Sequence, residues 1–186
     1  MRARLRPLAL TLIAVTLLTA STCGPDRAAL TDSPSAGPAA GGARAGTVPD
    51  ILRFTGTALD GSPYDGAQLA GRPTVLWFWE PSCTKCRAQG SEVMMTADMF
   101  EGDLGVIGVA GAGDPASLDE FVTATGARHL RHLTDPGRSI WKRFGIDKPG
   151  SYVLFDAAGE VAVRGADLDG RLTKEVTSLM GGPGMR

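Results

Sequence analysis

The segment from Trp77 to Cys86 reads WFWEPSCTKC and decides the expected fold. An apolar, aromatic run ends at Pro81, and two cysteines separated by two residues follow it. A buried strand that delivers a Cys-x-x-Cys pair to the first turn of a helix is typical of a dithiol/disulfide redox site. The segment therefore predicts a redox-active cysteine pair, Cys83 and Cys86, at a strand-to-helix junction.

The two cysteines are expected to lie one helical turn apart. Residues three apart at a helix start share a face, so their Cα atoms fall about 5–6 Å apart, within reach of a disulfide. Free backbone N–H groups and the helix dipole favour a thiolate on Cys83 at the helix N-terminus. We therefore predict that Cys83 is the attacking nucleophile and that Cys86 resolves the mixed disulfide. Lys85 should favour the Cys83 thiolate further, and the nearby carboxylate of Glu80 should oppose it.

A second feature is the Lys148-Pro149-Gly150 turn, which precedes an apolar strand segment at 151–155. A proline in a tight turn is a position where a cis peptide bond can occur. Because Pro149 has no backbone N–H, it leaves a backbone edge beside the cysteines with which an extended peptide could pair. This turn could therefore hold a cis bond, and we predict a substrate-binding role for Lys148 and Pro149.

The composition of the chain excludes several classes of protein. The 186 residues include 19 Lys and Arg against 20 Asp and Glu, for a net charge of −1, and three cysteines. A balanced charge without a basic stripe argues against nucleic-acid binding. Three cysteines are too few for a disulfide scaffold, so a buried core must hold the fold.

The first 47 residues predict export rather than a folded domain. Arginines precede an apolar segment, 7–20, that is short for a membrane-spanning helix. Residues 1–22 are therefore expected to be a signal peptide and Cys23 a lipidation site, although the residues before Cys23 depart from the usual lipidation pattern. Ordinary cleavage or a retained membrane anchor are the alternatives. The rest of segment 23–47 is rich in Ala, Gly, Pro and Ser, which predicts a flexible tether.

Residues 48–180 predict alternating strands and helices. Strands are expected at 51–54, 74–79, 104–110, 130–133, 151–155 and 160–164, and helices at 85–100, 115–125, 137–144 and 172–180. Tyr64 should begin the return strand of an N-terminal hairpin, and Ala88, Met95 and Met99 should form the apolar face of the first helix. The pattern predicts an α/β fold with a mixed central sheet. Residues 181–186 are expected to be a disordered tail.

Several motifs together resemble a known family. The Trp-Phe-Trp strand before Cys-x-x-Cys, the Gly-Ile-x-x-Pro segment and the Ala-Gly-Glu-Val hairpin are similar to those of thioredoxin-fold oxidoreductases. The helix-strand-helix segment 114–144 is similar to that of extracytoplasmic TlpA/ResA/DsbE-type proteins, and the phrases VLWFW, VIGVAG and SIWKRFGI resemble actinobacterial DsbE/DsbF-like proteins. The resemblance covers 48–180. It implies a thioredoxin fold with an N-terminal β-hairpin extension and a central helix-strand-helix insertion.

The resemblance also assigns roles to individual residues. It implies a redox-active disulfide between Cys83 and Cys86, the cis-proline at Pro149, and a place for Gly165 on the substrate-binding surface. We include Trp79 in that surface. No cofactor beyond the disulfide and no metal are implied. The chain departs from the family at Ser82, where Trp is usual. It also has Trp77 where thioredoxins proper bury an Asp, which favours a more oxidising couple.

The sequence predicts an extracytoplasmic thiol–disulfide oxidoreductase, acting as an oxidant on cysteine-containing secreted or membrane proteins. We expect a monomer on the outer face of the cytoplasmic membrane, lipid-anchored or secreted, which a membrane redox partner recycles. One alternative is a reductase for cytochrome c maturation, which would use the same residues in the opposite direction. The other is a metal-binding dithiol lipoprotein. That site would need further ligands, and the only histidines, His129 and His132, are expected on the surface.

Overall fold

The computed structural model describes residues 48–165 and 168–181. The predicted signal peptide, the lipidation site at Cys23 and the tether lie outside the described residues, as does the tail after Gly181. No helix within the described residues is long and apolar enough to cross a membrane.

One mixed sheet of seven strands forms the centre of the described domain, in the order β2-β1-β5-β4-β3-β6-β7. The strands are β1 (Thr55–Ala58), β2 (Pro63–Asp65), β3 (Thr74–Trp79), β4 (Gly105–Ala110), β5 (Arg131–Thr134), β6 (Ser151–Phe155) and β7 (Val161–Gly165). The helices are α1 (Thr84–Met99), α2 (Pro115–Ala124), α3 (Ser139–Arg143) and α4 (Leu172–Met180). The hairpin β1–β2 joins the sheet through β5, and the α2–β5–α3 segment supplies β5. The predicted thioredoxin fold, with its hairpin extension and central insertion, is therefore confirmed.

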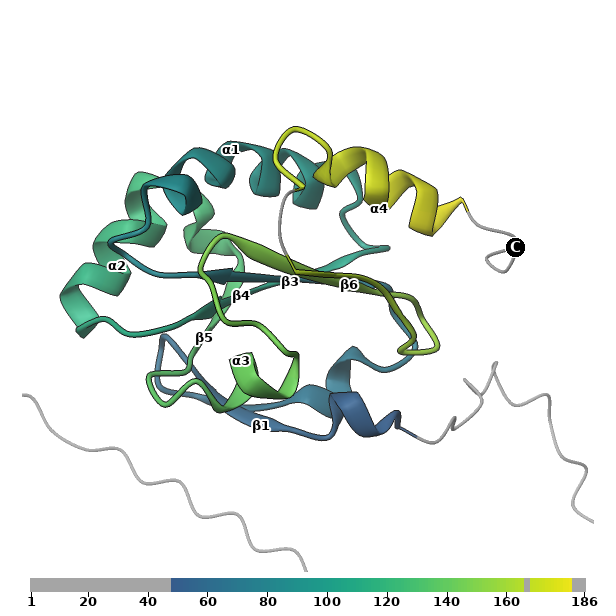
Figure 1. Cartoon of the computed structure of the whole chain (residues 1–186), viewed down its shortest axis with the longest axis horizontal. Helices are drawn as coiled ribbons and strands as arrows, with labels where there is room; N and C mark the ends of the chain where they lie inside the picture. Colours follow the sequence, from purple (N-terminus) through teal and green to yellow (C-terminus); the bar gives the residue numbers. More distant parts are fainter. Residues whose placement is uncertain (1–47, 166–167, 182–186) are drawn as a thin grey trace, which may run out of the picture. The chain divides into compact units, whose positions relative to one another are not determined.

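Alternation along β3 divides the core between the two faces of the sheet. Leu76 and Phe78 belong to the cluster that includes residues of α3 and the N-terminal segment. Val75, Trp77 and Trp79 belong to the other cluster, which includes residues of α1, α2 and α4. Figure 1 shows α1, α2 and α4 on one face of the sheet and α3 on the other. Every β3 residue is buried, as expected of a central strand covered on both faces.

The first predicted strand, 51–54, is wrong. Asp50–Leu52 forms a short 3₁₀ helix, and β1 begins only at Thr55. The Arg143 side chain explains this difference, because its guanidinium donates to the backbone carbonyls of Asp50, Ile51 and Arg53. These carbonyls therefore need no partner strand.

The predicted apolar face of α1 is also wrong. Met95 and Met99 are 52% and 58% exposed, and Ala88 is exposed as well. The buried face of α1 instead includes the polar residues Gln89 and Thr96, and the neighbouring Glu92 contacts the start of α4. Glu92 accepts hydrogen bonds from the backbone N–H groups of Gly170 (2.8 Å) and Leu172 (2.9 Å), and so caps α4 from a neighbouring helix.

The predicted surface position of His132, on β5, is also wrong. His132 is only 3% exposed, whereas the sequence predicted a surface position. Its Nδ1 accepts from Trp79 Nε1 (3.2 Å), so its Nε2 carries the proton and donates to Ala127 O (2.8 Å). Burial lowers the pKa of His132 to about 4, and the hydrogen bond to Ala127 opposes that shift only in part.

We expect this histidine to make the domain less stable in acid. The unfolded state takes up the His132 proton near pH 6.5 and the folded state only near pH 4, so the free energy of unfolding should fall as pH decreases between these values. The loss should amount to about 3 kcal/mol. Urea denaturation of the wild type and of His132→Gln at pH 7 and pH 4.5 measures it. The variant should show a flatter pH dependence.

The matched control for this measurement is His129→Gln, because His129 lies in the exposed segment only three residues earlier. It should keep most of the wild-type pH dependence, because the charge of His129 contributes least to the lowered pKa of His132 and burial contributes most. Equal flattening in both variants would show that burial of His132 is not the cause.

Candidate active site at the Cys83–Cys86 disulfide

The cysteine pair lies at the end of the central strand. β3 pairs with β4 on one side and with β6 on the other, and it ends at Trp79. A tight turn follows, in which the backbone N–H of Cys83 donates to Glu80 O (3.1 Å). Cys83 then forms the N-cap of α1, and its Sγ accepts from the backbone N–H of Cys86 (3.0 Å). The strand-to-helix placement predicted from the sequence is observed.

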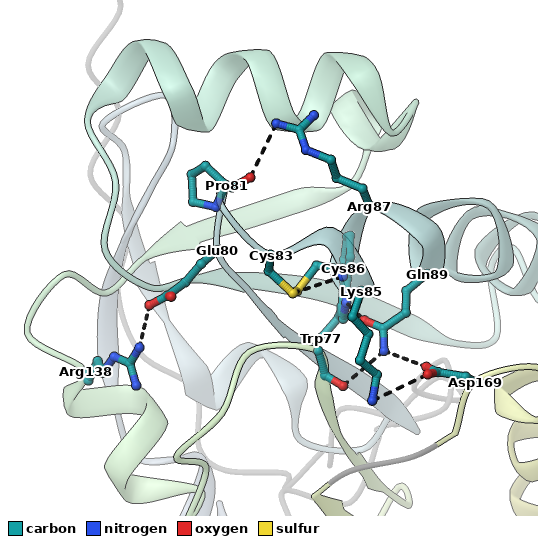
Figure 2. Close-up of a disulfide and its surroundings, with 11 residues drawn as sticks. Trp77, Glu80, Pro81, Cys83, Lys85, Cys86, Arg87, Gln89, Arg138 and Asp169 are labelled. Atoms are coloured by element: carbon teal, nitrogen blue, oxygen red, sulfur yellow. Dashed lines mark hydrogen bonds and ion pairs between the residues drawn. A yellow bond between two sulfur atoms is a disulfide. The ribbon is translucent and has the colours of Figure 1, made fainter.

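Cys83 and Cys86 are joined by a disulfide, with Cα atoms 5.2 Å apart (Figure 2). The separation lies within the predicted range. Cys83 is half-buried, whereas Cys86 is completely buried. An incoming thiolate can therefore reach the Cys83 sulfur more readily than the Cys86 sulfur. The first turn of α1 places backbone N–H groups beside Cys83, where they favour negative charge.

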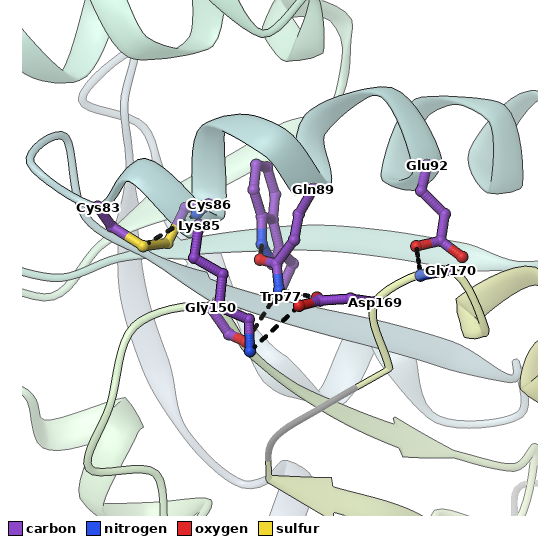
Figure 3. Close-up of polar contacts among 9 residues, drawn as sticks. All are labelled: Trp77, Cys83, Lys85, Cys86, Gln89, Glu92, Gly150, Asp169 and Gly170. Carbon is purple, nitrogen blue, oxygen red and sulfur yellow. Dashed lines mark hydrogen bonds and ion pairs between the residues drawn. A yellow bond between two sulfur atoms is a disulfide. The ribbon is translucent and has the colours of Figure 1, made fainter.

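A hydrogen-bonded network lies beside the first turns of α1 (Figure 3). Trp77 Nε1 donates to Gln89 Oε1 (2.9 Å). The amide nitrogen of Gln89 donates in turn to Gly150 O (3.0 Å) and to Asp169 Oδ1 (2.7 Å). The other oxygen of Asp169 lies 3.4 Å from Lys85 Nζ. The network thus joins β3, α1, the loop before β6 and the segment before α4.

Asp169 changes the expected role of Lys85. The sequence predicted that the charge of Lys85 favours the Cys83 thiolate, but its ammonium group also pairs with the Asp169 carboxylate. The pair is partly exposed, with 38% and 47% of the two side chains accessible, so solvent weakens it. Neither Gln89 nor Asp169 was predicted, because they lie 80 positions apart and local patterns do not show their contact. The spacing of Lys85, Gln89 and Glu92, which puts them on one helix face, is the signal that could have revealed it.

Glu80 is paired with a cation rather than left beside the disulfide. Its carboxylate accepts from Arg138 Nη2 (2.5 Å) and points away from the two sulfurs (Figure 2). The Glu80 side chain is 15% exposed. Its predicted opposition to the Cys83 thiolate is therefore offset by the guanidinium of Arg138.

The turn that contains Pro149 lies against α1, but its backbone differs from the prediction. No peptide bond in the described residues is cis, so the Lys148–Pro149 bond is trans. The chain reverses instead at Gly150, whose φ of 75° favours glycine and whose N–H donates to Phe78 O (2.8 Å). A Cβ on Gly150 would lie 3.0 Å from Cδ of Lys85, so the turn packs closely against the first two turns of α1.

The Redoxin family model matches residues 43–175 of the chain. The chain belongs to the Redoxin family. Its fold and its dithiol site are those of a thioredoxin-like thiol–disulfide oxidoreductase.

A secreted mycobacterial protein is similar to this chain. The soluble secreted antigen MPT53 of Mycobacterium tuberculosis is 33% identical over 116 residues, which cover 62% of this chain and 66% of MPT53. The chain thus spans slightly less than two thirds of the length of this curated relative.

Two solved structures are similar throughout their length. The MTB dsbF structure, in mixed oxidized and reduced forms, is 35% identical with a TM-score of 0.67, and covers 72% of this chain and 99% of its own. A secreted Mycobacterium tuberculosis disulfide oxidoreductase homologous to E. coli DsbE is 31% identical with a TM-score of 0.63, and covers 69% and 98%.

Within this Redoxin domain, Trp79 does not belong to a substrate surface, and that prediction is wrong. Trp79 is fully buried and stacks on Phe121, with ring centroids 4.1 Å apart. Gly165 is the last residue of β7 and pairs with Tyr152 of β6. It therefore lies at the same end of the strands as the C-terminus of β3, which leads to Cys83. Its role in substrate binding stays a prediction, as do those of the exposed Lys148 and the half-buried Pro149.

A metal site was the alternative use of the dithiol. Among the described residues, no group of three or more His, Cys, Asp or Glu side chains is arranged to hold a metal ion. Of the two histidines, His132 uses both ring nitrogens for hydrogen bonds within the core.

Proposed function

We propose that this protein is a thiol–disulfide oxidoreductase that oxidises cysteine pairs in secreted or membrane proteins outside the cytoplasm. The observation that supports this most directly is the half-buried Cys83 at the start of α1, bonded to a buried Cys86. In this arrangement one sulfur is accessible to a substrate thiolate and the other is protected. One of the two similar mycobacterial structures is that of a secreted disulfide oxidoreductase, and the other records dsbF in mixed oxidized and reduced forms.

The oxidation proceeds by two exchanges. A substrate thiolate attacks Cys83 Sγ, the Cys83–Cys86 bond breaks, and Cys86 leaves as a thiolate that takes up a proton. A second substrate thiolate then attacks the substrate sulfur of the mixed disulfide and releases Cys83 as a thiolate. The substrate gains a disulfide and loses two electrons, which the protein holds as two cysteine thiols or thiolates. A redox partner must remove these electrons before the next cycle.

The oxidising direction is supported by the charges around Cys83. A reduced form with a stabilised thiolate makes the disulfide a stronger oxidant. Trp77, an uncharged residue, occupies the position where thioredoxins proper bury an acid, and the Glu80 carboxylate is paired with Arg138. Asp169 is paired with Lys85. The start of α1 therefore remains the main uncompensated electrostatic influence on Cys83.

The location outside the cytoplasm is proposed from the N-terminal sequence and from the relatives. Residues 1–22 have the pattern of a signal peptide, and Cys23 follows as a candidate for lipidation. MPT53 is a soluble secreted antigen. We propose that a lipid on Cys23 holds a monomeric domain at the outer face of the cytoplasmic membrane, where a membrane redox partner recycles it.

The reduction potential of the Cys83–Cys86 couple tests the direction. We expect a value well above that of thioredoxin, which is about −270 mV. Equilibration of the purified domain with defined ratios of reduced and oxidised glutathione measures it, with thioredoxin as the reference protein. A value at or below that of thioredoxin would contradict the oxidant role and would favour a reductase for cytochrome c maturation.

A further inference from the structure

Arg138, the residue before α3, has an unusual backbone. Its φ of 54° and ψ of 35° lie in the left-handed region, and no other non-glycine residue of the described chain has a positive φ. Residues with a Cβ rarely adopt this left-handed conformation, and they do so where contacts with the surrounding structure stabilise it. The contacts of the Arg138 side chain show what holds this one.

The guanidinium of Arg138 contacts three elements at once. Nη2 donates to the Glu80 carboxylate (2.5 Å), and Nη1 donates to the backbone carbonyl of Asp147 (3.1 Å). The same group lies over the ring of Trp141, 4.5 Å from its centroid. A planar guanidinium with several fixed donors can make such contacts together, whereas an ammonium group cannot reproduce their geometry.

The partner carboxylate is itself held in place. Glu80 Oε1 also accepts from the backbone N–H of Ala112 (3.3 Å), in the loop after β4. A Cβ on Gly111 would lie only 2.5 Å from that oxygen, so glycine leaves the room that the carboxylate occupies. Arg138 therefore binds a fixed partner rather than a mobile surface side chain.

The two polar partners of Arg138 belong to the two halves of the candidate site. Glu80 starts the turn at 80–83, and its carbonyl accepts from the N–H of Cys83 (3.1 Å). Asp147 starts the turn at 147–150, whose other end is held by the hydrogen bond from Gly150 to Phe78. One guanidinium thus connects the turn that carries the accessible sulfur with the turn that carries Pro149.

We propose that Arg138 is a positioning residue, which fixes the 147–150 turn relative to the 80–83 turn so that a substrate peptide can contact Pro149 while its thiolate faces Cys83 Sγ. This inference rests on the proposed function. Disulfide exchange needs the attacking and leaving sulfurs aligned, so a small displacement of the peptide should lower the rate. A small thiol such as dithiothreitol needs no peptide contact and should not depend on the turn.

The test compares two substrates of the oxidised full-length protein. The first is a reduced peptide with two cysteines, and the second is dithiothreitol. In Arg138→Met, we expect the ratio of the two second-order rate constants, peptide to dithiothreitol, to fall about tenfold, mainly through a higher KM for the peptide. Arg128→Met is the matched control, because Arg128 pairs with Asp119 on α2 and contacts neither turn. Its ratio should equal that of the wild type.

A double variant separates position from charge. Arg138→Met alone leaves Glu80 unpaired near Cys83, which changes the reduction potential as well. Glu80→Gln with Arg138→Met removes both charges, so the potential should return toward the wild-type value while the rate ratio stays low. Arg138→Lys keeps a cation for Glu80 but not the second donor to Asp147, and should give an intermediate ratio. If Arg138→Met does not fold, the rate ratio of Arg138→Lys still tests the inference.

Three results would overturn the inference. A rate ratio in the double variant equal to that of the wild type would show that charge alone is involved. Equal losses with the peptide and with dithiothreitol would show a general structural role. A wild-type ratio in Arg138→Lys would show that the contact with Asp147 is dispensable. Failure of the wild type to oxidise any dithiol peptide, despite reaction with dithiothreitol, would instead contradict the proposed function.

Discussion

Replacement of Cys83 by alanine should abolish oxidation of a reduced, unfolded protein, with a loss of more than about 10³-fold. Cys83 is the accessible sulfur and lies at the N-terminus of α1, where its thiolate is favoured. Without it, no mixed disulfide can form at the exposed position, and the completely buried Cys86 cannot replace it. Recovery of activity in reduced ribonuclease or a comparable disulfide-containing protein measures the effect.

The matched variant is Cys86→Ala, which should behave differently. It retains the attacking thiol but lacks the resolving one, so it should accumulate a mixed disulfide on Cys83 when treated with oxidised glutathione. Mass spectrometry of the treated protein would show the adduct in Cys86→Ala and only a trace in Cys83→Ala. The reverse pattern would exchange the roles of the two cysteines, and full activity of Cys83→Ala would refute the mechanism.

Replacement of Trp79 by alanine should lower the free energy of unfolding by about 3–5 kcal/mol. Trp79 is fully buried, stacks on Phe121 and donates a hydrogen bond to His132. Its removal creates a large cavity and leaves the Nδ1 of His132 without its donor. Urea denaturation of the oxidised protein, followed by circular dichroism, measures the change.

Met95→Ala is the control for this variant. Met95 is 52% exposed on α1, so its loss should change stability by less than about 0.5 kcal/mol. A small stability loss in Trp79→Ala together with a raised KM for peptide substrates would contradict the burial argument and would restore Trp79 to the substrate surface.

Local patterns predicted the elements whose signals lie within a short stretch of sequence. The apolar segment 74–79 is β3, and the segment 172–180 is α4. The start of α2 was also predicted from the sequence, because Asp114 caps it by accepting from the N–H groups of Ala116 and Ser117. Hydrophobic periodicity, helix-capping residues and the Gly or Pro residues that end an element lie close together in the sequence. They therefore predict an element without knowledge of the tertiary structure.

The predictions that failed depend on contacts between distant segments. The strand expected at 51–54 does not form because the backbone carbonyls of this segment accept hydrogen bonds from Arg143, about 90 residues later. The expected apolar face of α1 is wrong because α1 directs Gln89 and Glu92 toward segments 61 to 80 positions later, where they form hydrogen bonds. Periodicity cannot distinguish a polar side chain that faces solvent from one that satisfies a distant backbone group.

The sequence by itself determined that Cys83 and Cys86 lie one turn apart at the start of a helix after a buried strand, because spacing and chain geometry alone set that distance. Only the tertiary structure decided the charges around the pair. It pairs Lys85 with Asp169 and Glu80 with Arg138, across 84 and 58 positions respectively. Electrostatic interactions depend on distance in space, and the folded sheet, rather than the order of residues, determines that distance.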